Sequence, residues 1–186
     1  MLDRIPIPKV DGPVRFGVIG LGMISEFHLK AINRIEQAIL LGVASRREEQ
    51  TKNIAAEHGC YAATDYRELL RIKELDVVCV TTSSGSHYEI GMEVLRSGKH
   101  LVVEKPLAMT AEQANELIAT AAERRLMLSV ISQRRFEPQH GIIKDVLSQG
   151  KLGRLLMAEV SCPYYRSQDY YDSADWRGRM DQDGGA

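Results

Sequence analysis

Residues 14–25 read VRFGVIGLGMIS, and this stretch decides the fold. An apolar run leads into a turn with two glycines one residue apart, Gly20 and Gly22, and a small residue, Ser25, follows three positions later. Apolar residues at helical spacing come next, so the turn joins a predicted strand to a predicted helix. In that context a glycine-rich turn presents the free amides of a helix N-terminus to an anion.

Each small residue has a defined task in such a turn. Gly20 permits the tight turn, Gly22 lets the backbone approach a pyrophosphate, and the third position needs a small residue where helix meets strand. The third position holds Ser25 rather than the usual Gly or Ala. Met23 and Ile24 would supply further amides at the helix start. An ordinary strand–turn–helix connection is the alternative, and the pattern around the turn favours a dinucleotide-binding site.

That surrounding pattern alternates short β-branched runs with helical segments. Continuous apolar runs indicate strands covered on both faces, and helical connections indicate a parallel sheet. One predicted helix ends at Gly59, another at Gly98, and a Thr110–Gln113 capping box begins a third. We therefore predict an α/β fold, a doubly wound parallel sheet of the Rossmann type, as a dinucleotide-binding domain over residues 1–134. The predicted strands are residues 14–20, 38–44, 60–63, 76–82, 100–104 and 126–131.

Residues 135–186 have a different pattern. A helix is predicted over 138–150 and one long strand over 154–166, followed by a polar, aromatic and irregular segment. One strand without a partner does not make a stable sheet. We expect residues 135–186 to be the beginning of an incomplete α+β substrate and oligomerisation domain, and the chain to be a fragment.

The end of the second predicted strand indicates which dinucleotide binds. An acid there would hydrogen-bond the ribose 2′-hydroxyl of NAD, but Ser45 and Arg46 occupy that place and Arg47 follows. A hydroxyl and a guanidinium would hold a 2′-phosphate through charge-assisted hydrogen bonds. The pattern favours NADP over NAD. The alternative is that both arginines are solvated and balanced by Glu48 and Glu49.

Two further stretches place reactive groups at the same edge of the sheet. Glu104 and Lys105 end the fifth predicted strand, and ligands of open α/β sheets bind at that edge. A lysine there can donate a proton to a carbonyl oxygen; the alternative is a surface lysine that ends the strand. After the fourth strand, Thr82, Ser83 and His87 supply hydroxyls and an imidazole, although a lone histidine at a helix start is more often a cap or a packing group than a base. The other four histidines have no partner spacing and are interpreted as structural or solvated.

The stretches GVIGLGMIS, TTSSGSH, VVEKPLAMT and QRRFEP come in the order and spacing of a known family. From about Val14 onward the chain resembles the Gfo/Idh/MocA family of sugar-type dehydrogenases. The resemblance implies hydride transfer between a nicotinamide and a carbinol carbon of a sugar, nucleotide-sugar or polyol, with Lys105 handling the proton. It implies that Glu104, Thr82 and His87 line the cofactor crevice.

The resemblance extends to the C-terminal segment, where DWRGRMDQDGGA matches the family at Trp176, Arg177 and two glycines, Gly184 and Gly185. Arg135, Trp176 and Arg177 would lie toward nicotinamide and substrate. The chain departs from the family at Ser83-Ser84, where Pro-Asn is common, and the family's catalytic histidine is expected beyond Ala186. We therefore expect this fragment to bind cofactor with little turnover, and the full-length protein to be a homo-oligomer.

Composition limits the other function classes. The net charge is −1 and the sequence pI is near 6.5, which does not suggest nucleic-acid or membrane partners. Three cysteines without metal spacing suggest a reducing, cytoplasmic compartment and no metal site. Three alternatives remain: a non-catalytic NAD(P)-binding sensor, a methyltransferase that uses the glycine-rich turn, and an interaction domain.

Overall fold

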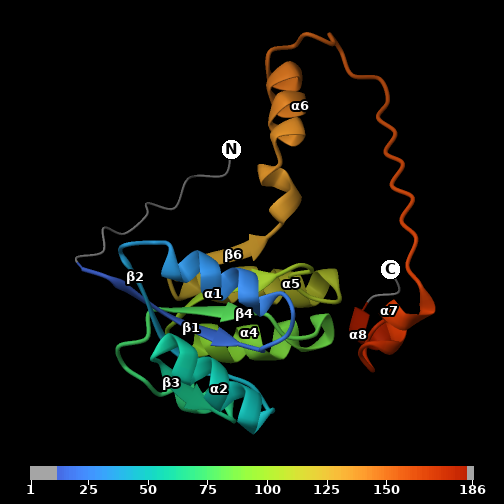
Figure 1. Cartoon of the computed structure of the whole chain (residues 1–186). Helices are drawn as coiled ribbons and strands as arrows, with labels where there is room; N and C mark the ends of the chain where they lie inside the picture. The colour runs from blue at the N-terminus through green and yellow to red at the C-terminus, as the bar shows by residue number, and fades with distance from the viewer. Residues whose placement is uncertain (1–11, 184–186) are drawn as a thin grey trace.

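A computed structural model describes residues 12–183 and shows a six-stranded sheet with helices on both faces (Figure 1). The strand order is β3-β2-β1-β4-β5-β6, and every neighbouring pair is parallel. This is the predicted doubly wound Rossmann sheet, and it is confirmed. The strands are β1 Val14–Ile19, β2 Ala38–Ala44, β3 Tyr61–Ala63, β4 Val77–Val80, β5 His100–Glu104 and β6 Leu128–Ile131.

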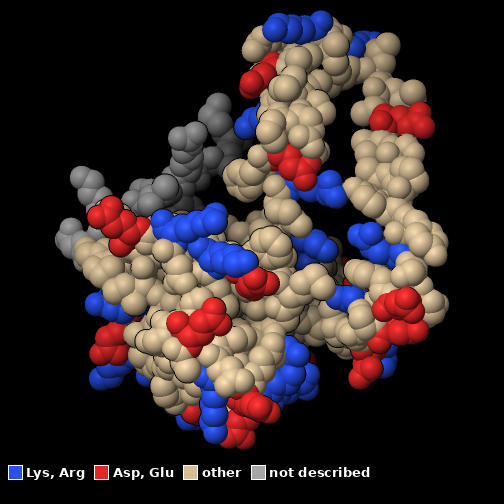
Figure 2. Space-filling view, viewed as in Figure 1, with Lys and Arg blue, Asp and Glu red and all other residues tan. Residues whose placement is uncertain are grey.

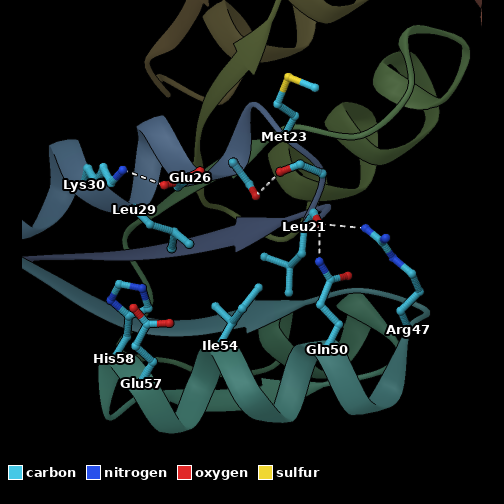
Figure 3. Close-up of a pocket in the computed structure, with 12 residues that line it drawn as sticks. Leu21, Met23, Glu26, Leu29, Lys30, Arg47, Gln50, Ile54, Glu57 and His58 are labelled. Atoms are coloured by element: carbon cyan, nitrogen blue, oxygen red, sulfur yellow. Dashed lines mark hydrogen bonds and ion pairs between the residues drawn. The ribbon is translucent and has the colours of Figure 1, made fainter. Parts of the chain in front are cut away.

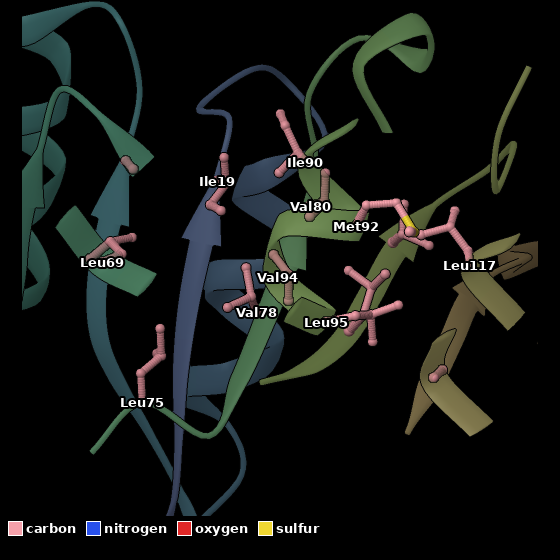
Figure 4. Close-up of a cluster of buried hydrophobic side chains, with 14 of the residues drawn as sticks. Ile19, Leu69, Leu75, Val78, Val80, Ile90, Met92, Val94, Leu95 and Leu117 are labelled. Carbon is pink, nitrogen blue, oxygen red and sulfur yellow. The ribbon is translucent and has the colours of Figure 1, made fainter. Parts of the chain in front are cut away.

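Two hydrophobic cores explain why the strands read as continuous apolar runs. Successive residues of a strand point to opposite faces, so β1 sends Val18 into one core and Ile19 into the other. In β4, Cys79 joins Val18, while Val78 and Val80 lie with Ile19 in the core drawn in Figure 4. Helices must therefore cover both faces of the sheet.

The covering helices begin and end where the sequence signals predict. Gly59 ends α2 in the left-handed conformation, with φ 63°. The Thr110 hydroxyl accepts from the Gln113 amide at 3.2 Å, and the Gln113 side chain accepts from the Met109 amide at 3.2 Å. The helices are α1 Ser25–Asn33, α2 Glu48–His58, α3 Tyr66–Leu70, α4 His87–Arg96, α5 Ala111–Glu123, α6 Pro138–Ser148, α7 Gln168–Asp172 and α8 Met180–Asp183, with short 3-10 turns η1 Ser84–Ser86 and η2 Gln133–Phe136.

One detail of α1 differs from the pattern that predicted it. Phe27 belongs to the apolar residues at helical spacing, yet 65% of it is exposed. Ser25, Leu29 and Ile32 are the buried residues of this helix. Because each residue advances about 100° around the helix, Phe27 lies roughly opposite the face that Ser25 and Leu29 turn to the sheet.

The strand predicted over residues 154–166 is wrong. Helix α6 projects from the sheet, and an extended segment then returns to α7 and α8 (Figure 1). No residue of 154–166 pairs with another strand, and large apolar side chains such as Met157 and Val160 are exposed. A strand requires a hydrogen-bonded neighbour, and none of the segments in residues 12–183 provides one.

Helix α8 contacts η1, so the end of the described chain lies beside the turn that follows β4. The expectations for residues 1–11 and for Gly184 and Gly185 fall outside the described residues. Within residues 12–183, none of the helices combines the length and apolar character that crossing a bilayer demands. Acidic and basic side chains are interspersed on the face shown in Figure 2.

Candidate functional site

The site lies where the strand order reverses, between β1 and β4. Gly20 leaves β1 with φ +94°, and a Cβ there would lie 2.7 Å from Cγ2 and 2.8 Å from the backbone N of Thr82. The Gly20 amide donates to the Ala44 carbonyl at 2.8 Å. Both the conformation and the contact with the β4 turn therefore require glycine at this position.

The turn after Gly20 carries free backbone donors. In the part of the chain that the structure describes, the amides of residues 21–24 have no hydrogen-bond acceptor. The Ser25 amide and hydroxyl both donate to the Gly22 carbonyl, at 3.1 and 2.6 Å, and Ser25 is only 3% exposed. Ser25 therefore fits the third small position and also closes the turn. Four successive unpaired amides at a helix start are donors of the kind that anions bind.

Gly22 also points to an anion at this turn, because neither its backbone conformation nor its packing explains a glycine there. Its φ lies outside the left-handed range, and a Cβ added to it would meet no atom within 4 Å. Neither backbone conformation nor a neighbouring protein atom calls for glycine there. Close approach of a ligand to the backbone is the remaining physical reason, which fits a dinucleotide diphosphate.

The two arginines after β2 have different surroundings. The Arg46 side chain is exposed and has no partner among residues 12–183. Arg47 instead donates from Nη2 to the Leu21 carbonyl at 2.6 Å, and its own amide donates to the Ser45 hydroxyl at 3.2 Å. Ser45 and Arg46 are thus available to a ligand at the end of β2, whereas Arg47 is engaged with the glycine-rich turn.

His87 is enclosed by the protein. It is 1% exposed, with Nδ1 2.7 Å from the Pro106 carbonyl oxygen and Nε2 3.1 Å from the Thr82 carbonyl oxygen. This geometry matches the packing role, because the imidazole ties the turn after β4 to the turn after β5. The hydroxyls of Thr82 and Ser83 remain at the partly exposed β4 turn, where the Ser86 hydroxyl donates to that of Thr82 at 2.8 Å.

Glu104 is the last residue of β5 and is buried. Its Oε1 is 2.9 Å from Nε2 of His28, and the two side chains are 7% and 10% exposed. His28 is thus structural rather than solvated, although its spacing in the sequence did not indicate this partner. His28 and Glu104 are 76 residues apart, and only the crossover that lays α1 over the sheet brings them together. Burial, and then the negative charge of Glu104, raise the pKa of the neighbouring Cys79 thiol to about 12.

Lys105 and Arg135 line one pocket of about 1020 Å³ between the sheet edge and α6. The Lys105 side chain is exposed, and no described residue pairs with its ammonium group. Other cationic residues share the pocket, although Arg134 pairs with Glu137 at 3.5 Å. The remaining lining residues are Ser132, Gln133, Phe136, His140, Gly141, Lys144 and Asp145.

Trp176 and Arg177 do not line that pocket. The Arg177 guanidinium lies over the Tyr170 ring at 4.4 Å and over the Trp176 ring at 5.6 Å, and it donates to the Tyr170 carbonyl at 3.0 Å. The segment is near the β4 turn through the contact of α8 with η1. Its expected place toward the substrate stays a prediction.

A second groove, of about 460 Å³, runs between α1 and α2 (Figure 3). Only its Leu21–Met23 end reaches the glycine-rich turn; the other end reaches His58, whose Nδ1 lies 2.9 Å from the Asn33 amide nitrogen. The described residues contain no group of three His, Cys, Asp or Glu side chains that could hold a metal ion.

Comparison with known proteins identifies relatives of this chain. The chain is 31% identical over 170 residues to scyllo-inositol 2-dehydrogenase (NADP(+)) of Bacillus subtilis, covering 91% of this chain and 46% of that protein. A solved WlbA dehydrogenase from Bordetella pertussis, in complex with NADH and UDP-GlcNAcA, has a TM-score of 0.88 and 31% identity over 92% of this chain and 53% of that one. A 3-ketoreductase from Actinomadura kijaniata, in complex with TDP-benzene and NADP, has a TM-score of 0.70 and 34% identity over 75% of this chain and 44% of that one.

The chain thus spans about half the length of the curated relatives it matches. The model of the Gfo/Idh/MocA oxidoreductase family, described by its NAD-binding Rossmann fold, matches residues 14–132, which contain the glycine-rich turn and Lys105. The chain belongs to the Gfo/Idh/MocA family of oxidoreductases.

Proposed function

We propose that this chain binds NADP(H), with its diphosphate on the amides of residues 21–24. The observation that carries the proposal is the run of unpaired amides at the start of α1, next to a glycine that neither conformation nor packing requires. A dianionic diphosphate satisfies these donors and gains from the positive end of the helix dipole. Met23 and Ile24 contribute through their amides.

Ser45 and Arg46 would hold the ribose 2′-phosphate. The Arg46 guanidinium has no protein partner in the described chain, and no carboxylate stands at the end of β2 to repel a phosphate. The relatives include proteins solved with NADH and with NADP, so this preference rests on the residues of this chain. Thr82 and Ser83 would line the crevice at the β4 turn, and Glu104 would support it from below.

We infer that the enzyme transfers a hydride between nicotinamide and a hydroxyl-bearing carbon of a sugar, nucleotide-sugar or polyol. The bound nicotinamide supplies or accepts the hydride. Lys105 would exchange the proton with the substrate oxygen, because its unpaired ammonium group lines the pocket at the end of β5. Arg135 would orient the substrate in that pocket, and Trp176 and Arg177 would approach it from α7 and α8.

Little turnover is expected from the 186 residues alone. The side chains around Lys105 that come from η2 and α6 are exposed, so they would hold a neutral sugar weakly and exclude little water. Cofactor binding should survive, because the glycine-rich turn belongs to the well-packed sheet domain.

Fluorescence titration with NADPH, NADH and S-adenosylmethionine tests the proposal. We expect NADPH to bind more tightly than NADH, and S-adenosylmethionine not to bind. The Arg46→Ala variant should weaken the affinity for NADPH about ten- to a hundredfold and leave the affinity for NADH nearly unchanged. The reason is that only NADPH carries the 2′-phosphate with which Arg46 would make a charge-assisted hydrogen bond.

The matched control is Arg34→Ala, which removes the same charge from an exposed position after α1. An equal loss of NADPH affinity in Arg46→Ala and Arg34→Ala would indicate a long-range charge effect and overturn the role of Arg46. Absence of dinucleotide binding by the wild-type chain would overturn the proposed function. Lys105→Ala should keep cofactor affinity and abolish any residual sugar oxidation, whereas a sensor would be indifferent to this change.

A further inference from the structure

The carbonyl group of Leu21 receives two side-chain donors from the start of α2, one from Gln50 and one from the N-cap residue Arg47. Arg47 Nη2 lies 2.6 Å and Gln50 Nε2 lies 3.0 Å from this oxygen (Figure 3). Leu21 stands between the two glycines of the turn, and its side chain is buried beneath them. Two donors from one helix therefore fix the orientation of a single peptide group in the candidate anion site.

The orientation of that peptide group decides where the next amide points. In a trans peptide the C=O bond and the following N–H bond point in opposite directions. With the Leu21 carbonyl held toward α2, the Gly22 N–H is directed away from α2. The Gly22 amide is one of the donors that have no acceptor in residues 12–183.

The orientation of the Gln50 side chain lowers the stability of the folded state. A carbonyl oxygen only accepts, so the amide nitrogen of Gln50 must face Leu21. The Gln50 Oε1 is then buried without a hydrogen-bond partner among the described residues. An unpaired buried acceptor disfavours the folded state, and a leucine of similar size would avoid that cost. Stability of the fold alone does not explain a glutamine here.

We propose that Arg47 and Gln50 form a clamp that orients the Gly22 amide toward the cofactor diphosphate. Arg47 and Gln50 are positioning residues, while Arg46, its neighbour in sequence, reads the 2′-phosphate. The clamp serves NADH and NADPH equally, because both carry the diphosphate. This inference rests on the proposed cofactor site.

Titrations of four variants with both dinucleotides test the clamp. Arg47→Met and Gln50→Leu should each raise the dissociation constants of NADH and NADPH about five- to tenfold, by the same factor for both, since each variant loses one donor to Leu21. Arg46→Ala should change the ratio between the two dinucleotides. Lys52→Met, on α2, is the control because the partner of Lys52 among residues 12–183 is Glu48, and it should leave both constants unchanged.

Two additional readouts separate positioning from charge and from general stability. Gln50→Leu removes no charge, so its loss of affinity cannot come from weaker attraction of the diphosphate. Its melting temperature should equal or exceed that of the wild type, because the buried unpaired oxygen is gone. In ¹H–¹⁵N spectra with saturating inorganic pyrophosphate, the Gly22 amide should shift less in Gln50→Leu than in the wild type.

Several outcomes would overturn the clamp. If Arg47→Met weakened the binding of NADPH and not that of NADH, Arg47 would be a ligand of the 2′-phosphate. If both clamp variants bound like the wild type, orientation of Leu21 would not matter, although the proposed function would stand. If Gln50→Leu lowered both the melting temperature and the affinity for the dinucleotides, the role of Gln50 would be structural. If the wild type bound neither dinucleotide, the clamp and the proposed function would both fall.

Discussion

The two glycines of the turn after β1 should respond in opposite ways to the same substitution. Gly20→Ala places a Cβ 2.7–2.9 Å from three atoms of Thr81 and Thr82, two of them backbone, at φ +94°. The left-handed conformation costs about 1–2 kcal/mol for alanine. The overpacking adds about 1–3 kcal/mol. We therefore expect Gly20→Ala to lose roughly 2–5 kcal/mol of unfolding free energy, a large part of the about 5–15 kcal/mol typical of a folded domain.

Gly22→Ala is the matched variant, two residues away from the strained position. Its Cβ meets nothing within 4 Å and its φ is ordinary, so the folded state loses nothing. Restricting the unfolded chain should leave stability unchanged or raise it by about 0.4–1 kcal/mol. The new methyl group would instead occupy space that the diphosphate needs, and NADPH affinity should fall at least about tenfold.

Urea unfolding followed by far-UV circular dichroism measures the first effect, and NADPH fluorescence measures the second. Gly20→Ala should shift the unfolding midpoint to lower urea, and Gly22→Ala should not. The reasoning would be refuted if Gly22→Ala destabilised the fold as much as Gly20→Ala, or if it bound NADPH like the wild type. The first result would mean that the turn is packed at Gly22, and the second that the diphosphate lies elsewhere.

Three further predictions concern the packing around the site. Because burial and then Glu104 raise the pKa of Cys79 to about 12, mild alkylation of the native protein should label the exposed Cys162 and leave Cys79 unlabelled until urea unfolds the chain, as mass spectrometry will show. Replacing either His28 or Glu104 by leucine should cost about 1–3 kcal/mol in urea unfolding, and the double variant should cost less than the sum, since neither group is then left buried alone; strict additivity would contradict the pairing. Burial, followed by the hydrogen bond that the Tyr66 hydroxyl donates to the Glu93 carboxylate, raises the pKa of Tyr66 from 10.0 to about 12, so the stabilisation that Tyr66 contributes is complete below pH 10 and is lost as the pH rises toward 12. A Tyr66→Phe variant should lose less unfolding free energy than the wild type between pH 10 and pH 12. An equal loss in both proteins would show that Tyr66 does not cause this pH dependence.

The amino-acid sequence by itself determined the order and type of the elements in the sheet domain. Short apolar runs separated by helical segments predicted all six strands, because a strand buried on both faces needs no alternation. Local capping chemistry predicted helix ends such as Gly59 and the Thr110 box, since these interactions involve only neighbouring residues. Local patterns failed where pairing decides structure: residues 154–166 have the composition of a strand but find no partner in the described chain.

Local sequence patterns also predicted much of the candidate site. The turn with Gly20 and Gly22, and Lys105 at the end of β5, could be read from position alone, because the carboxyl ends of parallel strands meet at one edge.

Only the tertiary structure decided which side chains partner one another there. Arg46 and Arg47 are adjacent and chemically identical, yet Arg46 has no partner in the described part of the chain and Arg47 holds the Leu21 carbonyl, 26 residues away. The partner of Glu104, 76 residues distant, was equally invisible. The physical reason is that a hydrogen bond depends on distance and direction in space, and for residues brought together by a crossover neither is encoded in their spacing along the chain.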